Sequence, residues 1–450
     1  MKKQIKKQLM KLLALLEEAH KIIAESIEKD NRAVAKAYLE ECQNTAIAVG
    51  TKIDEVEGTG TASVVRLENY CDLVYTIYEQ ILSGNLLKPS EIYNKLDKSY
   101  HSIVHRMEQE LPEIVEVVFL PYKASMWDSL ESVWEKADAD PCIEAKVIPI
   151  PYYDKNQDGS FGKLHYEGGE FPSYVPIIHY DSYDFEKSHP DAIYIHNPYD
   201  NWNVVTSVHP FFYSKNLKKY TDKLVYIPYF ILKEIDIKNK NKVMEKSHYV
   251  QLPAVIYADE IIVQSENMKQ FYIECMVMMA GETVRKAYEQ KIKGIGSPKI
   301  EKIRKMNDEG IEIPEEWKPY FFQPDGRKKK VVLYNTSISA FLKESDRMLH
   351  KMEQVFEVFK RQKDEITLLW RPHPLMEATV CSTRPQLYEQ YLRIVEKYKR
   401  EGFGIYDDSS DMDRALVLAD AYYGDQSSLV VLCNAIHKPI MIQNVSVANI

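Results

Sequence analysis

Two side chains that can bind phosphate stand in the segment LLWRPHP, residues 368–374, directly after an apolar run. Arg371 can grip a phosphate group with two parallel hydrogen bonds, and His373 can donate a further one. Pro372 and Pro374 restrict the backbone around both residues. A cation and an imidazole held stiffly at the end of a strand predict an anion site, and a pyrophosphate is the anion that we expect there.

Polar residues follow two more apolar segments in the same half of the chain. Ligands of open parallel sheets bind beyond the carboxyl ends of the strands, so we expect these residues to meet the R-P-H-P segment. The segment GDQSSL opens a helix, whose unpaired N–H groups and partial positive charge favour anions. The candidate nucleotide-binding residues are Asn335, Thr336, Arg371, His373, Gly424, Asp425, Gln426, Ser427 and Ser428.

Each of these segments also has a simpler interpretation when it is taken singly. A Ser-Ser pair at a helix start is most often a cap, and Asp425 near the helix dipole can cap as well. The R-P-H-P segment can be a turn with an ion pair. Three polar strand ends in one domain favour the nucleotide site over these separate explanations.

The first half of the α/β region is rich in aromatic and amide side chains, which suit a polyol or sugar acceptor. Deprotonation of an acceptor hydroxyl needs a group with a pKa near neutrality, within hydrogen-bond reach. His196 follows the apolar segment DAIYI, and His209 lies in the loop beyond it. We predict that His196 or His209 is the catalytic base, with Asp200 as a weaker candidate and a structural histidine as the alternative.

Charge and cysteine usage exclude several classes of protein. The 450 residues carry a net charge of −9, whereas a general nucleic-acid binder needs a basic surface, so we expect no nucleic-acid partner. The six cysteines are scattered, which favours a reduced, cytoplasmic location over a disulfide framework or a zinc site. The sequence contains neither a metal-binding constellation nor a P-loop motif, so no metal or other cofactor is expected.

Residues 1–112 lack a convincing strand and are expected to form a helical bundle or a pair of hairpins. Apolar periodicity and breaks predict helices over residues 3–28, 32–55, 62–83 and 91–109. Such a region suits the assembly of several chains, so we keep a homo-oligomer formed through it as one alternative. The lysine-rich residues 1–20 could lie on the inner face of the cell membrane as a basic amphipathic helix, although packing within the bundle is slightly favoured.

From Val115 onward, short β-branched runs alternate with helical stretches, a pattern typical of parallel sheets covered by helices. The candidate strands of the first series are IVEVVFL, AKVIPIP, VPIIHY, DAIYIH, KLVYIPY and DEIIVQS. The polar segment NQDGSFGKLHYEGGEF is expected to be a long exposed loop. We predict two doubly wound, Rossmann-like domains, residues 113–280 and 281–450, which face each other across a cleft in the arrangement called GT-B.

The second domain resembles the CDP-glycerol glycerophosphotransferases, which polymerise teichoic acid and related wall or capsule polymers. The similar segments, in order, are GIGSPKIEKI, KKVVLYNTS, EITLLWRPHPL and DDSSDMDRALVLADAYYGDQSSLVVLCNAIHKPIM. The resemblance implies that Arg371, His373 and the QSS helix start bind the CDP pyrophosphate. It also implies that the DDSSDM stretch lies near the nucleoside. Members of that family sit at the cytoplasmic membrane face and often carry a basic amphipathic element, which strengthens the membrane alternative for the lysine-rich residues.

Three features depart from that family. The His-Gly pair that supplies its presumed base is absent, since the corresponding place reads KLVYIPYF. The family's arginine just after the Asn335 segment is missing as well. Relatives continue with further helices beyond KPIMIQ, so the second domain is expected to be shortened at its C-terminal end.

The function that these observations predict is transfer of a glycerol-phosphate or similar polyol-phosphate group. The donor would be CDP-glycerol or a related CDP-linked compound, and the acceptor a polymer or lipid-linked polyol or glycan in cell-wall or capsule synthesis. Two alternatives stay open: a GT-B glycosyltransferase that uses a nucleotide sugar, and a non-catalytic scaffold derived from the same family.

Overall fold

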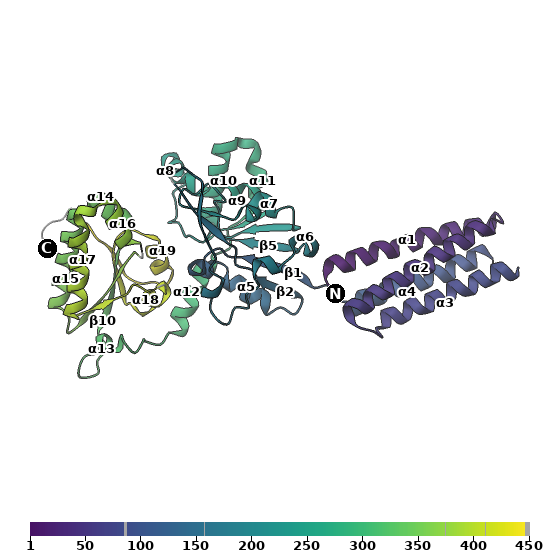
Figure 1. The fold of residues 1–450 in the computed structure, drawn as a ribbon, viewed down its shortest axis with the longest axis horizontal. Coiled ribbons are helices and arrows are strands. Elements are labelled where there is room, and N and C mark those ends of the chain that lie inside the picture. Colours follow the sequence, from purple (N-terminus) through teal and green to yellow (C-terminus); the bar gives the residue numbers. More distant parts are fainter. Residues whose placement is uncertain (85–87, 157, 374, 410, 446–450) are drawn as a thin grey trace.

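The molecule consists of a helical rod, a middle α/β domain and a terminal α/β domain, arranged along its long axis (Figure 1). The computed structural model describes residues 1–84, 88–156, 158–373, 375–409 and 411–445. Pro374 of the R-P-H-P segment lies outside the described residues.

The rod is a bundle of long helices that projects away from the α/β domains (Figure 1). Its helices are α1 (Lys3–Glu28), α2 (Arg32–Glu57), α3 (Ala62–Ser83) and α4 (Pro89–Glu110). Apolar residues at helical spacing, such as Leu9, Leu13 and Leu16 of α1, form its buried core. Thr61 caps α3 by accepting a hydrogen bond from the N–H of Val64. The predicted helical region is therefore confirmed.

The lysine-rich start of α1 is tied to the middle domain. Lys2 forms a parallel bridge with Ile114, and its ammonium lies 2.7 Å from a carboxylate oxygen of Glu116. The buried ammonium of Lys6 donates a hydrogen bond of 2.6 Å to the carbonyl of Leu111. Lys2 and Lys6 are thus engaged within the molecule, in line with the favoured packing of this helix, and contact of the other lysines with lipid stays the alternative.

The middle domain is built on a parallel sheet with the strand order β2-β1-β5-β7-β8-β9. Its strands are β1 (Val115–Leu120), β2 (Ile143–Val147), β5 (Ala192–Ile195), β7 (Lys223–Tyr226), β8 (Glu260–Ile262) and β9 (Ile292–Lys293). The helical segments around it are η1 (Ala124–Ser129), α5 (Glu131–Asp138), α6 (Phe185–Ser188), η4 (Pro210–Phe212), α7 (Ser214–Leu217), α8 (Lys240–Lys246), α9 (Pro253–Tyr257), α10 (Glu266–Ala280) and α11 (Arg285–Lys291). Because β9 pairs with β8, the first sheet continues beyond residue 280.

A small antiparallel sheet extends the middle domain. It has the order β4-β3-β6 and contains β3 (Tyr152–Lys155), β4 (Phe161–His165) and β6 (Thr206–Val208). Strand β4 lies in the segment expected to be a loop, because a turn at Gly159 folds it back on β3. The expected strand VPIIHY forms only a bridge at Ile177 and a 3₁₀ turn, η3 (Tyr180–Ser182), since Pro176 has no N–H to donate.

The terminal domain holds a second parallel sheet with the order β12-β11-β10-β13-β14. Its strands are β10 (Lys330–Thr336), β11 (Ile366–Pro372), β12 (Ile405–Tyr406), β13 (Ala421–Gly424) and β14 (Ile440–Ile442). Its helices are α13 (Lys318–Phe321), α14 (Ile338–Glu344), α15 (Asp346–Arg361), α16 (Met376–Thr383), α17 (Pro385–Glu401), α18 (Met412–Leu418) and α19 (Ser428–Ala435), while α12 (Pro298–Glu309) lies between the two domains (Figure 1). The fold is therefore α/β, with two Rossmann-like domains preceded by a helical region, as predicted.

Candidate functional site

A cavity of about 660 Å³ lies between the two α/β domains, and we call it the cleft. Asn335, Arg371 and His373 line it from the terminal domain, and Trp127 and Tyr229 line it from the middle domain. The volume is in the range of small-molecule sites. The cleft lies at the carboxyl ends of β10 and β11, where the parallel-sheet rule places a ligand.

Asn335 is the central residue of the terminal-domain wall. The parallel register places it level with Arg371 of β11 on one side and with Gly424 of β13 on the other. Its side-chain amide donates a hydrogen bond of 3.2 Å to the hydroxyl of Ser427. The three strand ends identified in the sequence therefore meet at one edge of the sheet.

Gly424 permits the close approach of β13 to β10. Its φ is +146°, and a Cβ atom on it would lie 2.2 Å from the carbonyl oxygen of Asn335. Any side chain at this position would push the two strands apart. Glycine is thus required for α19 to begin beside Asn335, and Gly424 acts through this geometry.

Helix α19 begins at the cleft. Ser427 is its N-cap and accepts a hydrogen bond of 3.3 Å from the N–H of Leu429. Ser428 is exposed, and both serines line the cleft. The N–H groups of a first helical turn, with hydroxyls beside them, form a site suited to an anion.

Arg371 is buried, and its guanidinium is already engaged. It forms an ion pair with Asp407 and donates a hydrogen bond of 2.7 Å to the carbonyl of Ser409. The expected two-point grip on a phosphate therefore does not describe Arg371. Arg371 instead holds the segment that precedes α18, because it binds Asp407 and Ser409 of that segment. Its charge is neutralised by the carboxylate of Asp407, which is buried as well.

His373 presents its ring to the cleft. The backbone N–H of His373 donates a hydrogen bond of 3.0 Å to the carbonyl of Thr336. The ring Nδ1 accepts a hydrogen bond of 3.1 Å from the backbone N–H of Leu375. A neutral imidazole with Nδ1 as acceptor carries its proton on Nε2, which is then the donor. Although the ring is exposed, partial desolvation lowers its pKa below the ordinary value, which favours this neutral form.

Three other candidate residues of the terminal domain do not present free side chains to the cleft. Thr336 is fully buried, and its hydroxyl accepts a hydrogen bond of 3.2 Å from the indole of Trp370. Asp425 accepts one of 2.6 Å from the N–H of Ser337, and burial raises its pKa above the ordinary value. Gln426 is exposed and is not part of the cleft wall. We therefore assign structural roles to Thr336 and Asp425.

His196 is fully buried in the middle domain. Its Nε2 accepts a hydrogen bond of 3.0 Å from the N–H of Tyr122, and its Nδ1 lies 2.8 Å from the hydroxyl of Ser129. Burial lowers the pKa of His196 to about 3. Because both ring nitrogens are engaged and no solvent reaches them, this position argues against the expected base role, and His196 ties β5 to the segment after β1.

The other two base candidates lie outside the cleft as well. His209 lines a separate cavity on the middle domain, where its Nδ1 accepts a hydrogen bond of 3.3 Å from the N–H of Phe211. Asp200 is buried and accepts hydrogen bonds from Ser214, of 3.0 Å from the N–H and 2.6 Å from the hydroxyl. Burial raises the pKa of Asp200 to about 6. Neither residue is placed to deprotonate a molecule in the cleft.

Sequence reasoning missed a cluster of charged residues in the cleft. Lys299 of α12 lies 2.9 Å from Asp128, and Lys302 lies 2.9 Å from Glu131 and 3.5 Å from Asp413. Asp128 and Glu131 belong to the middle domain and Asp413 to the terminal domain, so Lys302 bridges the two. The available signal was the spacing in SPKIEKI, which puts both lysines on one helix face.

The pKa values of this cluster follow from burial and pairing. Burial and the negative charge of Asp128 raise the pKa of Asp413 above its ordinary value. For Lys302, burial opposes the charged form, but the hydrogen bond and charge of Glu131 outweigh it and raise the pKa. One carboxylate oxygen of Asp128, Oδ1, is buried without a hydrogen-bond partner among the described residues.

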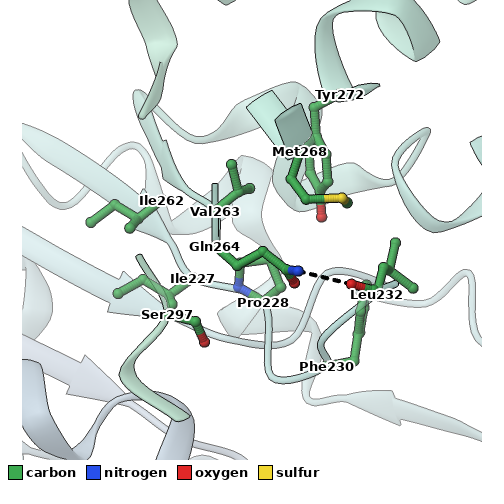
Figure 2. A pocket seen from close by; sticks show the side chains of 10 residues that line it. All are labelled: Ile227, Pro228, Phe230, Leu232, Ile262, Val263, Gln264, Met268, Tyr272 and Ser297. Carbon is green, nitrogen blue, oxygen red and sulfur yellow. Dashed lines mark hydrogen bonds between the residues drawn. The ribbon is translucent and has the colours of Figure 1, made fainter. Parts of the chain in front are cut away.

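A much smaller pocket lies beside the cleft in the middle domain. Figure 2 shows its lining, where the side-chain amide of Gln264 donates a hydrogen bond of 2.8 Å to the carbonyl of Leu232. Its volume of about 20 Å³ has room for little more than a water molecule. We assign it no ligand.

The described residues form neither a metal-binding cluster nor a helix that could cross a membrane. Within the described ranges, no three His, Cys, Asp or Glu side chains are grouped so that they could hold a metal ion. Across the same ranges, no helix has the length and apolar character required to cross a bilayer.

Comparison with known proteins gives a limited likeness. No protein-family model matches the chain, and no curated protein matches it. A putative UDP-N-acetylglucosamine 2-epimerase from Listeria monocytogenes is 13% identical, with 73% of this chain and 79% of that chain covered, at a TM-score of 0.44. The UDP-GlcNAc 2-epimerase from Methanocaldococcus jannaschii is 10% identical, with 73% and 83% covered, at a TM-score of 0.41.

A third structure, an O-GlcNAc transferase mutant from Thermobaculum terrenum, is 9% identical, with 98% of this chain and 83% of that chain covered, at a TM-score of 0.33. Similarity at such low TM-scores and identities does not indicate which reaction this chain catalyses. The two parallel sheets themselves define the class: an α/β protein with two Rossmann-like domains in a GT-B-like arrangement and an N-terminal helical bundle.

Proposed function

We propose that the chain is a transferase that moves a glycerol-phosphate or similar polyol-phosphate group from a CDP-linked donor to a polymer or lipid-linked acceptor in cell-wall or capsule synthesis. The observation that carries this proposal is the convergence of Asn335, His373 and the start of α19 on one cleft between two domains. The resemblance of these segments to the CDP-glycerol glycerophosphotransferases supports the donor class.

The donor's pyrophosphate would bind at the start of α19. The N–H and hydroxyl of Ser428 and the Nε2–H of His373 are the donors proposed for it, because the N–H groups of Leu429 and Val430 already donate to Ser427. Lys299 and Lys302 also line the cleft, where their charges are paired with the carboxylates of Asp128, Glu131 and Asp413. Arg371 acts as a positioning residue, because it orders the segment after β12 through Asp407.

Asp128 is our candidate for the catalytic base, in place of the residues suggested by the sequence. Asp128 lines the cleft, its Oδ1 is buried without a hydrogen-bond partner among the described residues, and its Oδ2 is held 2.9 Å from Lys299, so binding of the acceptor would have to expose this carboxylate. The acceptor oxygen would attack the donor's β-phosphorus as its proton passes to Asp128. The new O–P bond forms as the P–O bond to CMP breaks, and the α19 start stabilises the charge on departing CMP.

Ligand-induced thermal stabilisation tests the donor class. A ligand that binds only the native state raises the melting temperature, so a panel of CDP-glycerol, CDP-ribitol, CMP, UMP and UDP-sugars is informative. We expect stabilisation by CDP-glycerol and CMP but not by UMP. Stabilisation by a UDP-sugar alone would replace the proposal with a nucleotide-sugar transferase, and no response to any ligand would favour a scaffold.

A charge variant localises the binding site. Ser428→Asp places a carboxylate at the start of α19 and is expected to abolish the shift caused by CMP, because it repels the phosphate. Asn434→Asp is the matched control, since it adds the same charge to an exposed position near the other end of the same helix. Equal loss in both variants, or in neither, would contradict binding at the helix start.

A further inference from the structure

A second cavity, of about 510 Å³, opens on the middle domain, and we call it the side cavity. It is lined by residues of β3, of the segment around α6 and of η4, and among the described residues it shares no lining side chain with the cleft. Its volume suits a small organic molecule. The side cavity is independent of the proposed donor site.

Aromatic rings form most of the wall of the side cavity and hold one another in place. Phe211 stacks on Tyr220, with ring centroids 5.3 Å apart and an interplanar angle of 25°. Tyr153 stacks on Phe161 at 4.8 Å and 13°. Rings fixed by such contacts give a preformed, largely apolar wall that a ligand need not reorganise.

Tyr183 also lines the side cavity, but its hydroxyl is not available to a ligand. It donates a hydrogen bond of 2.9 Å to a carboxylate oxygen of Glu116, which also pairs with Lys2 and Lys146. The ring of Tyr183 therefore contributes an apolar surface, and its polar end is already satisfied by the core of the domain.

The side chains of the described side-cavity wall that are charged at neutral pH are all carboxylates. Asp181, Asp184 and Glu186 are exposed, and the described lining contains no lysine or arginine. Asp184 also caps α6 by accepting a hydrogen bond of 3.0 Å from the N–H of Lys187. Glu186 makes no hydrogen bond or ion pair with any described residue. The side cavity is thus negative, so it repels phosphate and is unsuited to a second donor nucleotide.

We infer that the side cavity binds a small organic cation, such as an ammonium-bearing molecule. Aromatic rings attract cations through their quadrupoles, and carboxylates at the rim add charge attraction without a competing basic residue. A neutral polyol can donate hydrogen bonds to these carboxylates, but unlike a cation it gains no net charge attraction from them. The charge of the ligand, more than its shape, is therefore the property that the side cavity selects.

Calorimetry on the full chain tests this inference with choline as the probe cation and 3,3-dimethylbutan-1-ol as its uncharged isostere. We expect choline to bind at least about tenfold more tightly than the isostere, with affinity that falls as salt is raised. Glycerol and glucose form the neutral polyol arm. Equal binding of choline and the isostere, binding of the polyols alone, or no binding of choline at millimolar concentration would overturn the inference.

Surface variants assign the binding to this cavity without risk to the core. Glu186→Gln and Asp181→Asn are expected to weaken choline binding about tenfold together, because each removes one rim charge. Glu316→Gln is the control, since Glu316 is also exposed but lies between α12 and α13. Unchanged affinity in the double variant would place the cation elsewhere and refute the site.

Discussion

The side-chain amide of Asn335 donates a 3.2 Å hydrogen bond to the hydroxyl of Ser427, the residue that caps α19. This contact joins the end of β10 to the start of a helix 92 residues further along the chain. Because the same amide also reaches the hydroxyl of Tyr422 at 3.1 Å, Asn335 fixes where the first turn of α19 opens into the cleft.

Asn335→Ala is expected to weaken CMP binding about tenfold, because the loss of the amide leaves the first turn of α19 free to shift. The melting temperature should fall by only a few degrees, since one hydrogen-bond donor is worth about 1 kcal/mol. Calorimetric titration with CMP measures the effect. Asn434→Ala, an exposed substitution on the same helix, should leave CMP affinity unchanged, and a parallel loss there would argue against the specific role of Asn335.

Lys302 is expected to keep the two α/β domains together, because it pairs with Glu131 of one domain and Asp413 of the other. Lys302→Met removes the bridging charge and leaves the buried Glu131 and the half-buried Asp413 without it, which is unfavourable. We predict a larger radius of gyration in small-angle X-ray scattering. Lys305→Met, on the exposed side of α12, is the control. An unchanged scattering profile for Lys302→Met would show that the pair is not needed for closure.

The helical bundle should lose stability in mild acid because of His20. The ring is fully buried, its Nε2 lies 2.6 Å from the hydroxyl of Tyr70, and burial lowers its pKa to about 4. In the unfolded chain a histidine titrates near pH 6.5. The folded state thus resists protonation, and its stability is complete above about pH 6.5 and falls toward pH 4, by up to about 3 kcal/mol.

Thermal unfolding followed by circular dichroism between about pH 4.5 and pH 7.5 measures this dependence. His20→Gln should flatten the pH dependence of the melting temperature relative to the parent chain. His101→Gln replaces an exposed histidine of α4 and should retain the parent's profile. Identical profiles for the parent and His20→Gln would exclude His20 as the source.

Local patterns made the fold and one wall of the cleft predictable. The bundle helices were predictable from the spacing of apolar residues and from breaks such as KDN. The start and end of a helix depend on residues nearby in the sequence. The rule that parallel strands end at the same edge placed Asn335, Arg371 and Gly424 together. These inferences use only sequence-local information and the geometry of a parallel sheet.

Pairings between distant segments were not predictable from the sequence. Arg371 was expected to hold phosphate, but Asp407 of a later loop neutralises it. His196 follows a strand as expected, yet Tyr122 and Ser129 enclose its ring. Lys302 gained its role only because α12 lies between two domains. In each case the partner comes from another part of the chain, and no local pattern marks it.

The attachment of α1 to the middle domain restricts how the rod can move relative to that domain. Lys2 bridges Ile114 at the base of β1 and pairs with Glu116 within it, so the rod is anchored to the sheet by more than the single chain connection after α4. These contacts restrict rotation of the bundle about the connection after α4 more than that connection alone would. A change in the direction of the rod would therefore also turn the first sheet, and with it the middle-domain wall of the cleft.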